Sequence, residues 1–199
     1  MSWGNDSDNT NIALMMSGQF GPYTKSPGIY HCPADMSVGT GQTINRVRSI
    51  SMNFAVGDKS INGIGQRVYD PSYPPDLGPW PNFLKTFEFK IASLTWVFAD
   101  EHPDSINDGF LCPPTSASDI AGVSVEEWGD MPASYHNGAA GFAFADGHAQ
   151  IHKWLQAQTD HAIVKNPNWL PWNATLPFTD FKWVESRMSP SPTNAVSGE

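Results

Sequence analysis

The sequence predicts an α+β fold: a single domain over residues 1–188 with an antiparallel sheet and long loops rich in glycine and proline, then a disordered tail over 189–199. Three observations carry this prediction: a hairpin pattern around Asp146-Gly147, an apolar run that ends at Ala99, and 17 glycines and 17 prolines that interrupt regular structure. A length of 199 residues is enough to bury one core.

The first half of the chain predicts few regular elements. Residues 1–45 are rich in Asn, Ser, Gly and Asp and are expected to form an entry segment, with a short helix possible over residues 9–16. Residues 47–54 alternate apolar with polar side chains, which predicts a half-buried strand with one irregularity. The glycines and prolines of residues 57–82 predict a long surface loop.

The second half begins with the most apolar segment. Residues 94–99 are nearly continuous in apolar character, which predicts a central strand buried on both faces. Residues 113–135 read as a loop in which Ser124 starts a short turn of helix. Thr179 is expected to cap a short final helix over residues 180–188.

The hairpin comprises residues 141–145, the turn Asp146-Gly147, and residues 148–154. Asp-Gly between two such runs favours a two-residue type I′ turn, because both central positions of that turn need a positive φ. This register pairs Phe144 with Ala149 and Phe142 with Ile151. It therefore predicts that Phe142, Phe144 and Ile151 share one buried face.

Charge and hydropathy exclude several classes of partner. With 20 acidic and 11 basic residues the net charge is −9, which disfavours nucleic acid and anionic lipid, whereas a cation or a neutral glycan fits. No apolar run reaches the ~20 residues of a membrane-spanning helix, and no signal peptide begins the chain, so a soluble chain is expected. The two cysteines, Cys32 and Cys112, leave two alternatives open, one disulfide or two buried thiols.

His136, nine residues and then Asp146-Gly147 form a spaced motif, and four further pieces accompany it in order: residues 30–35, 48–53, 98–109 and 180–183. Together they resemble the bacterial prepilin-type, processing-associated H-X9-DG family. The resemblance implies a pseudopilin-like globular domain in the cell envelope or periplasm, with pilin-like or secretion-system proteins as partners. The N-terminal transmembrane helix of that family does not occur in this sequence, so the sheet face it would cover is expected to be exposed or to self-associate.

The acidic segment after the central strand predicts a calcium site. Carboxylate and amide oxygens are the ligands that Ca²⁺ prefers, although their spacing does not match an EF-hand loop. Related pseudopilins hold a calcium ion in a loop of the globular domain, which the resemblance carries over as an expectation. The alternative is a solvated acidic loop whose side chains close turns. The candidate ligands are Asp100, Asp104, Asn107 and Asp108.

An enzyme is the second possibility. Paired carboxylates can act as acid and base in glycoside cleavage, and the eight tryptophans offer flat surfaces for sugar rings. His136 can join such a site if a carboxylate polarises it, or can be structural. The candidate catalytic residues are Asp100, Glu101, Glu126, Glu127, Asp130 and His136. The sequence thus leaves two hypotheses: a non-catalytic pseudopilin-like component that binds calcium, or a glycoside hydrolase on a pilin-like scaffold.

Overall fold

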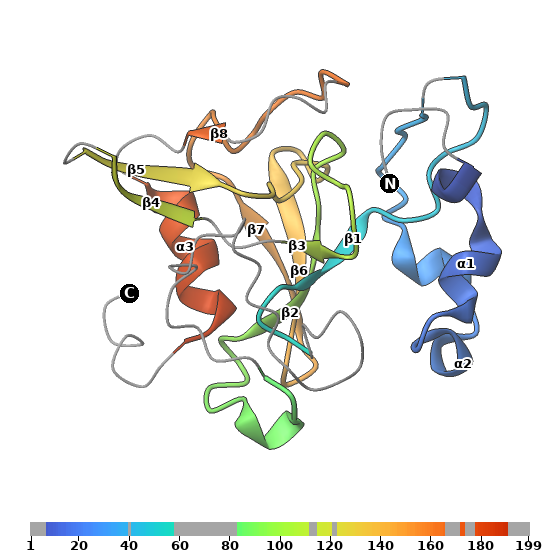
Figure 1. Cartoon of the computed structure of the whole chain (residues 1–199), viewed down its shortest axis with the longest axis horizontal. Coiled ribbons are helices and arrows are strands. Elements are labelled where there is room, and N and C mark those ends of the chain that lie inside the picture. The colour runs from blue at the N-terminus through green and yellow to red at the C-terminus, as the bar shows by residue number, and fades with distance from the viewer. Residues whose placement is uncertain are drawn as a thin grey trace.

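A computed structural model describes residues 7–39, 41–57, 83–111, 115–120, 123–165, 172–173 and 178–190, with the backbone alone for 115–120, 123–127 and 172–173. The chain is mixed α/β, and its main sheet has the strand order β3-β1-β2-β6-β7. These strands are β1 (Ile50–Asn53), β2 (Trp96–Asp100), β3 (Phe110–Leu111), β6 (Ala139–Phe144) and β7 (Ala149–Lys153). Figure 1 shows this sheet between a C-terminal helix and the N-terminal helices.

The helices are short. They are α1 (Ile12–Ser17), α2 (Gly21–Thr24) and α3 (Thr179–Met188), with 3-10 turns η1 (Ser7–Thr10), η2 (Pro27–Tyr30) and η3 (Thr86–Glu88). The short N-terminal helix expected over residues 9–16 corresponds to α1, which begins later because the Asn11 side chain accepts the backbone N–H groups of Ala13 and Leu14. Among the described residues, no helix is long and apolar enough to cross a membrane.

The predicted strands over 47–54 and 94–99 both form, as β1 and β2. β2 is the middle strand of five, as expected for a central strand. Trp96 and Ala99 are both buried although they are three residues apart, because a register shift lies between Trp96 and Phe98. Val97 and Phe98 are half-buried, so one face of β2 is fully covered and the other only partly.

The expectation of a wholly antiparallel sheet is wrong at one pair. β1 pairs antiparallel with β2 but parallel with β3. The chain reverses after β2 and returns on the far side of β1, which gives β3 the direction of β1. The sheet is therefore mixed.

The hairpin forms, but its predicted turn and register are wrong. Ala143 pairs with Ala149 and Gly141 with Ile151, one residue away from the predicted register. The Gly147 N–H donates to the Phe144 carbonyl at 2.9 Å, and Gly147 has a φ of +94°, which describes a three-residue loop ending in a left-handed glycine.

A shift of one residue turns a strand's side chains to the opposite face. Phe142 and Phe144 are buried as expected, at 2% and 4% exposure, whereas Ile151 is 64% exposed on the other face of the sheet.

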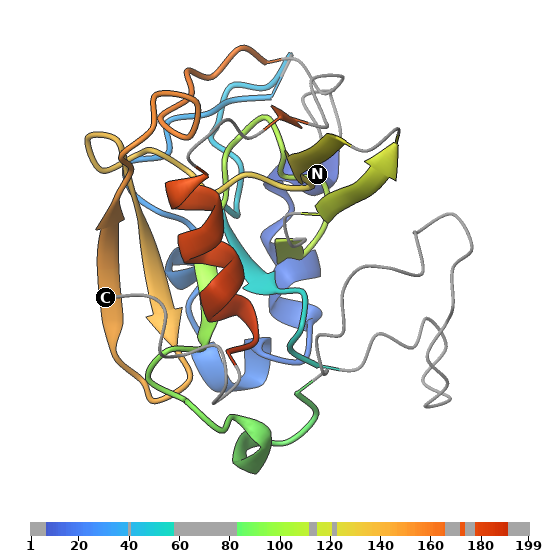
Figure 2. The same ribbon diagram turned by 90° about the vertical axis from the view of Figure 1, so that its left-hand side faces the viewer.

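α3 covers the inner face of the sheet (Figure 2). The Trp96 indole N–H donates to the Val184 carbonyl at 3.1 Å, and the Asn53 amide donates to the Met188 carbonyl at 2.8 Å. The predicted final helix is confirmed, but Thr179 is not its cap: Phe178 precedes the helix with a φ of +58° and no side-chain cap. In the first turn of this helix, the Asp180 carboxylate is buried and accepts the backbone N–H groups of residues that follow β7.

Within the predicted loop over 113–135, residues 115–120 and 123–128 form strands, and Ser124 lies in the second strand rather than starting a helical turn. The strands β4 (Thr115–Ile120) and β5 (Val123–Trp128) pair antiparallel, and β8 (Trp172–Asn173) completes a second sheet. Val123, Val125 and Trp128 have high strand propensity, which outweighs the weak helix-start signal at Ser124. Most of the surface loop predicted over 57–82, and residues 191–199 of the predicted tail, lie outside the described residues.

Candidate functional site

The carboxylates at the end of β2 lie in three polar networks, of which the first two meet at Ser105, rather than in one acidic site. Asp100 contacts His136, Glu101 contacts two serines, and Asp104 contacts a backbone segment near residue 164. Successive residues of a strand point to opposite faces, so neighbours in the sequence reach different surroundings.

Glu101 lies in the first network and is completely buried. One carboxylate oxygen accepts the Ser105 hydroxyl at 3.0 Å, and the other accepts the hydroxyl of Ser51. The Arg48 guanidinium donates to that Ser51 hydroxyl at 2.6 Å and so links its positive charge to the carboxylate. Arg48 also donates to the Ile50 carbonyl at 3.0 Å and to the Asp108 carbonyl.

Burial is the main cause that raises the pKa of Glu101 well above its usual value, and the nearby Asp130 carboxylate raises it further. Arg48 and the two serine hydroxyls act in the opposite direction. The structure thus places Glu101 close to Asp130, which is itself 5% exposed. This is a pair of carboxylates of the kind the enzyme hypothesis needs, but both members are enclosed.

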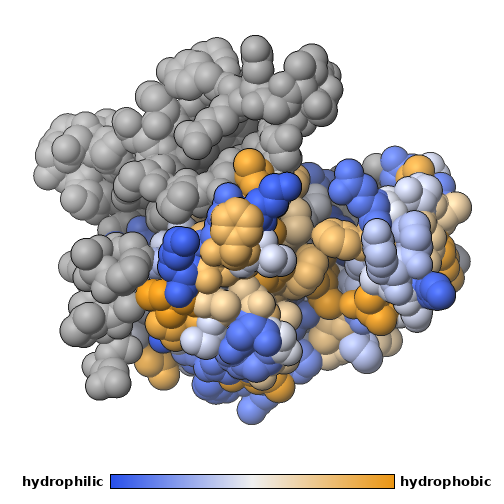
Figure 3. Space-filling model, turned by 90° about the horizontal axis from the view of Figure 1, so that it is seen from below, coloured by the Kyte–Doolittle hydropathy of each residue, from blue (hydrophilic) through white to orange (hydrophobic). Residues whose placement is uncertain are grey.

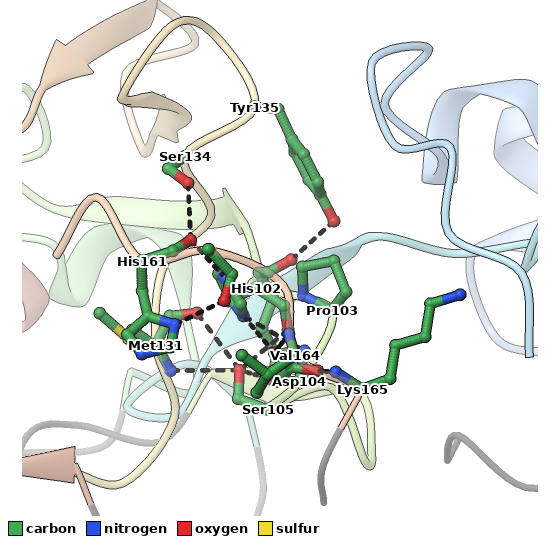
Figure 4. A network of polar contacts seen from close by, with 12 residues as sticks. His102, Pro103, Asp104, Ser105, Met131, Ser134, Tyr135, His161, Val164 and Lys165 are labelled. Carbon is green, nitrogen blue, oxygen red and sulfur yellow. Dashed lines mark hydrogen bonds and ion pairs between the residues drawn. The ribbon is translucent and has the colours of Figure 1, made fainter. Parts of the chain in front are cut away.

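His102 and Asp104 form the second network with the segment around His161 (Figure 4). The two Asp104 oxygens accept the N–H groups of Val164 and Lys165 at 2.7 and 2.8 Å. His102 Nδ1 accepts the Asp104 N–H at 3.2 Å, and its Nε2 lies 3.0 Å from the His161 carbonyl oxygen and donates to it. Burial lowers the pKa of His102, so the neutral ring that these contacts require is favoured.

Asp100 belongs to the third network, with His136 and Cys32. Its Oδ2 atom lies 3.3 Å from His136 Nε2 and accepts the Gly141 N–H at 2.8 Å. The same His136 nitrogen lies 3.6 Å from Cys32 Sγ. Burial raises the pKa of Asp100, while the Gly141 N–H and His136 lower it. Asp146, the turn residue of the same sequence motif, contacts His148 Nδ1 at 2.6 Å.

The candidate calcium ligands are divided among these surroundings. Asp100 and Asp104 take part in different networks, and Asp108 accepts the Phe110 N–H at 2.8 Å. Asn107 is exposed. In the part of the chain that the structure describes, two groups of His, Cys, Asp or Glu bring three ligand atoms within 4.8 Å of one another: Cys32, Asp100 and His136, and His102, Asp104 and His161. Neither includes Asp108.

Two of the candidate catalytic residues are placed only by their backbone. Glu126 and Glu127 lie on β5, opposite Ser116 and Thr115. Their side chains lie outside the described part of the chain.

The outer face of the sheet, on the side away from α3, carries an open pocket of about 280 Å³. Small residues of the hairpin form its floor, and larger apolar side chains and Asp100 border it. It is lined by Ile50, Phe98, Ala99, Asp100, Gly141, Phe142, Ala143, Ala149, Gln150 and Ile151. The Phe20 ring contacts the Phe98 ring at 6.0 Å, so the N-terminal segment lies beside this face. Figure 3 shows apolar surface where the N-terminal helices meet the rest of the molecule.

Four residues on which the networks depend were not predicted as site residues: Cys32, Arg48, Ser51 and Ser105. Cys32 and His136 are 104 positions apart, so no short spacing motif connects them. A weaker signal was present, because residues 30–35, 98–109 and 136 all belong to the pieces that carry the family resemblance, and these three pieces meet at the third network.

Comparisons with known proteins add no relative: no protein-family model matches the chain, and neither a curated protein nor a solved structure is significantly similar to it.

Proposed function

We propose that this chain is a non-catalytic, pilin-like component of a bacterial envelope assembly of the secretion or pilus type, and that it meets a helix of a pilin-like partner through the outer face of its sheet. The observation that carries the proposal is the pocket on that face. Ala143 and Ala149 on its floor let another backbone approach closely, while Ile50 and Ile151 offer apolar area at the rim.

The exposure of Ile151 supports this function. A strand residue this apolar at 64% exposure is a candidate contact residue, and Phe98, which also lines the pocket, is only half-buried. α3 covers the opposite face, and the N-terminal helices beside the outer face leave Ile151 exposed, so the outer face is the side of the sheet to which a further helix can be added.

A site-specific crosslink tests the proposal. A photoreactive phenylalanine analogue is placed at Ile151 in the full chain, expressed in its native bacterium, and the crosslinked proteins are identified by mass spectrometry. Leu155, which is 73% exposed and does not line the pocket, is the matched control position. We expect a pilin-like protein from position 151 and not from 155. Crosslinks from 151 to a second copy of this chain alone would assign the face to self-association and refute the partner, as would no crosslink at all.

The hydrolase alternative has one specific observation in its favour, the raised pKa of Glu101 beside Asp130. Glu101 is completely buried, however, and its oxygens are held by Ser51 and Ser105, which supports a structural role for the pair. Purified protein assayed on chromogenic glycosides and polysaccharides decides between the two. Activity that Glu101→Gln or Asp130→Asn abolishes in a folded protein would favour the hydrolase.

Calcium binding remains a proposal for the acidic segment. The backbone N–H groups that Asp104 and Asp108 accept support the alternative, in which these side chains fix loops without a metal ion. Thermal unfolding with millimolar Ca²⁺ and with a chelator tests it, because an ion that binds only the folded state raises the melting temperature.

A further inference from the structure

We propose that Cys32, Asp100 and His136 form a zinc site in which the Cys32 thiolate, Asp100 Oδ2 and His136 Nε2 are three ligands and the fourth position takes water or another ligand. This inference concerns the third network and does not depend on the proposed partner.

The distances between the donor atoms match a tetrahedral zinc ion. With Zn–S of about 2.3 Å and Zn–N and Zn–O of about 2.0–2.1 Å, tetrahedral angles place sulfur and nitrogen about 3.6 Å apart and nitrogen and oxygen about 3.3 Å apart. Cys32 Sγ lies 3.6 Å from His136 Nε2, and Nε2 lies 3.3 Å from Asp100 Oδ2. All three atoms lie within 4.8 Å of one another, a grouping that could hold one metal ion.

The arrangement differs from that of a catalytic triad. In a triad the histidine uses one ring nitrogen toward the nucleophile and the other toward the carboxylate. Here the same His136 nitrogen faces both Cys32 and Asp100. Three donors that converge on one point are what a metal ion requires.

Backbone contacts fix Cys32 in place. The Cys32 N–H donates to the Ser49 hydroxyl at 2.7 Å, which ties this turn to the main sheet. Burial is the largest effect on the thiol and raises its pKa, and the Asp100 charge raises it as well, while the backbone N–H groups of Ala34 and Asp35 lower it. A divalent cation bound between the Cys32 thiolate and the Asp100 carboxylate offsets their negative charges. It thereby removes the unfavourable effects of burial and of the Asp100 charge on the thiolate.

Asp100 is also held in place for this role. Its Oδ2 atom accepts the Gly141 N–H at 2.8 Å, and a Cβ atom at position 141 would lie 2.9 Å from that oxygen. Glycine at 141 therefore allows the carboxylate to lie against the strand and point toward His136. His136 has a side chain that is 33% exposed, which leaves a path for an ion to enter.

The other group of ligand-type residues is less suited. Both ring nitrogens of His102 are used, one by the Asp104 N–H and the other by the His161 carbonyl. That group also has no sulfur. Thiolate and imidazole favour zinc over calcium, so the third network predicts a different metal from the one that the acidic segment suggested.

Cobalt substitution tests the site, because Co²⁺ bound by a thiolate gives a charge-transfer band and a tetrahedral Co²⁺ site gives strong visible bands. The full chain is freed of metal with a chelator, kept reduced, titrated with Co²⁺ and then with Zn²⁺. We expect one cobalt ion per chain, a thiolate band, and loss of that band when zinc displaces the cobalt.

The variants are Cys32→Ser and His136→Gln, with Cys112→Ser as the matched control because it removes the chain's other cysteine. Cys112→Ser should keep the spectrum, whereas Cys32→Ser should lose the thiolate band and His136→Gln should bind cobalt at least about ten-fold more weakly, since each ligand contributes to affinity. Circular dichroism with chelator present checks that each variant folds. If Cys32→Ser does not fold, His136→Gln is the decisive variant, because the His136 side chain is partly exposed.

Three results would overturn the proposal. One is a wild-type titration without a thiolate band, and another is a band that persists in Cys32→Ser but disappears in Cys112→Ser. The third is cobalt binding that survives His136→Gln and is lost in His102→Gln, which would place the ion in the other group.

Discussion

Replacing Gly147 with alanine measures how much the left-handed turn contributes to the hairpin. Gly147 has a φ of +94°, and an added Cβ atom would meet no heavy atom within 4 Å, so the substitution introduces no clash. The cost is therefore conformational, about 1–2 kcal/mol for an L-residue held at positive φ. At about 2–4 °C per kcal/mol for a chain of this size, the melting temperature should fall by about 2–8 °C.

Gly109 provides the matched control. A Cβ atom there also meets nothing within 4 Å, but Gly109 does not have a left-handed φ. Gly109→Ala should leave the melting temperature unchanged or raise it slightly, because alanine restricts the unfolded chain more than glycine does. Gly147→Asn should lose less stability than Gly147→Ala, since asparagine tolerates positive φ. Calorimetry of the three variants decides, and equal melting temperatures for the two alanine variants would refute the role of the turn.

Two further predictions concern buried carboxylates. Because the pKa of Glu101 is raised, the folded state keeps a proton that the unfolded state loses. The contribution of Glu101 to the free energy of unfolding is therefore full below the ordinary glutamate pKa. This contribution is lost as the pH rises through the folded-state pKa. Glu101→Gln should flatten this decline in urea unfolding between pH 4 and pH 8, and parallel wild-type and variant profiles would contradict the buried acid. Asp180→Ala should cost about 1–3 kcal/mol in the same assay, because the N–H groups of Leu155 and Gln156 lose their acceptor. Glu185→Ala, which removes a surface pair with Lys182, should change stability by less than about 1 kcal/mol, and an equal effect of the two substitutions would argue against the buried acceptor.

Patterns of neighbouring residues correctly predicted the strands and the final helix, whose structure depends mainly on those residues. The apolar run at 94–99, the alternation at 47–54 and the final helix all form, because each segment has enough apolar or strand-forming residues to specify its own structure. The hairpin was located correctly, but its register was not. Asp-Gly is compatible with two loop lengths that differ by one residue, and Ala145 joins the loop in the longer one.

The candidate site was harder to predict because its contacts are not local. Glu101 was chosen as one of several acids, yet its surroundings come from Ser51, fifty positions earlier, and from Asp130. For Cys32 the sequence predicts only half of a disulfide or a buried thiol, since no second cysteine lies at metal-ligand spacing from it. In the structure it is a free thiol, while Cys112 lies outside the described residues.

The position of α3 late in the chain has a consequence for biosynthesis. Trp96 and Phe142 are covered by a helix that begins only at Thr179, so the ribosome must release the chain through Met188 before this apolar surface can be closed. Until then the nascent sheet exposes aromatic side chains, the kind of surface that chaperones bind and through which partly folded chains aggregate. Chains that stop translation before residue 179 should therefore be degraded or aggregate, even though every strand of the main sheet has already been synthesised.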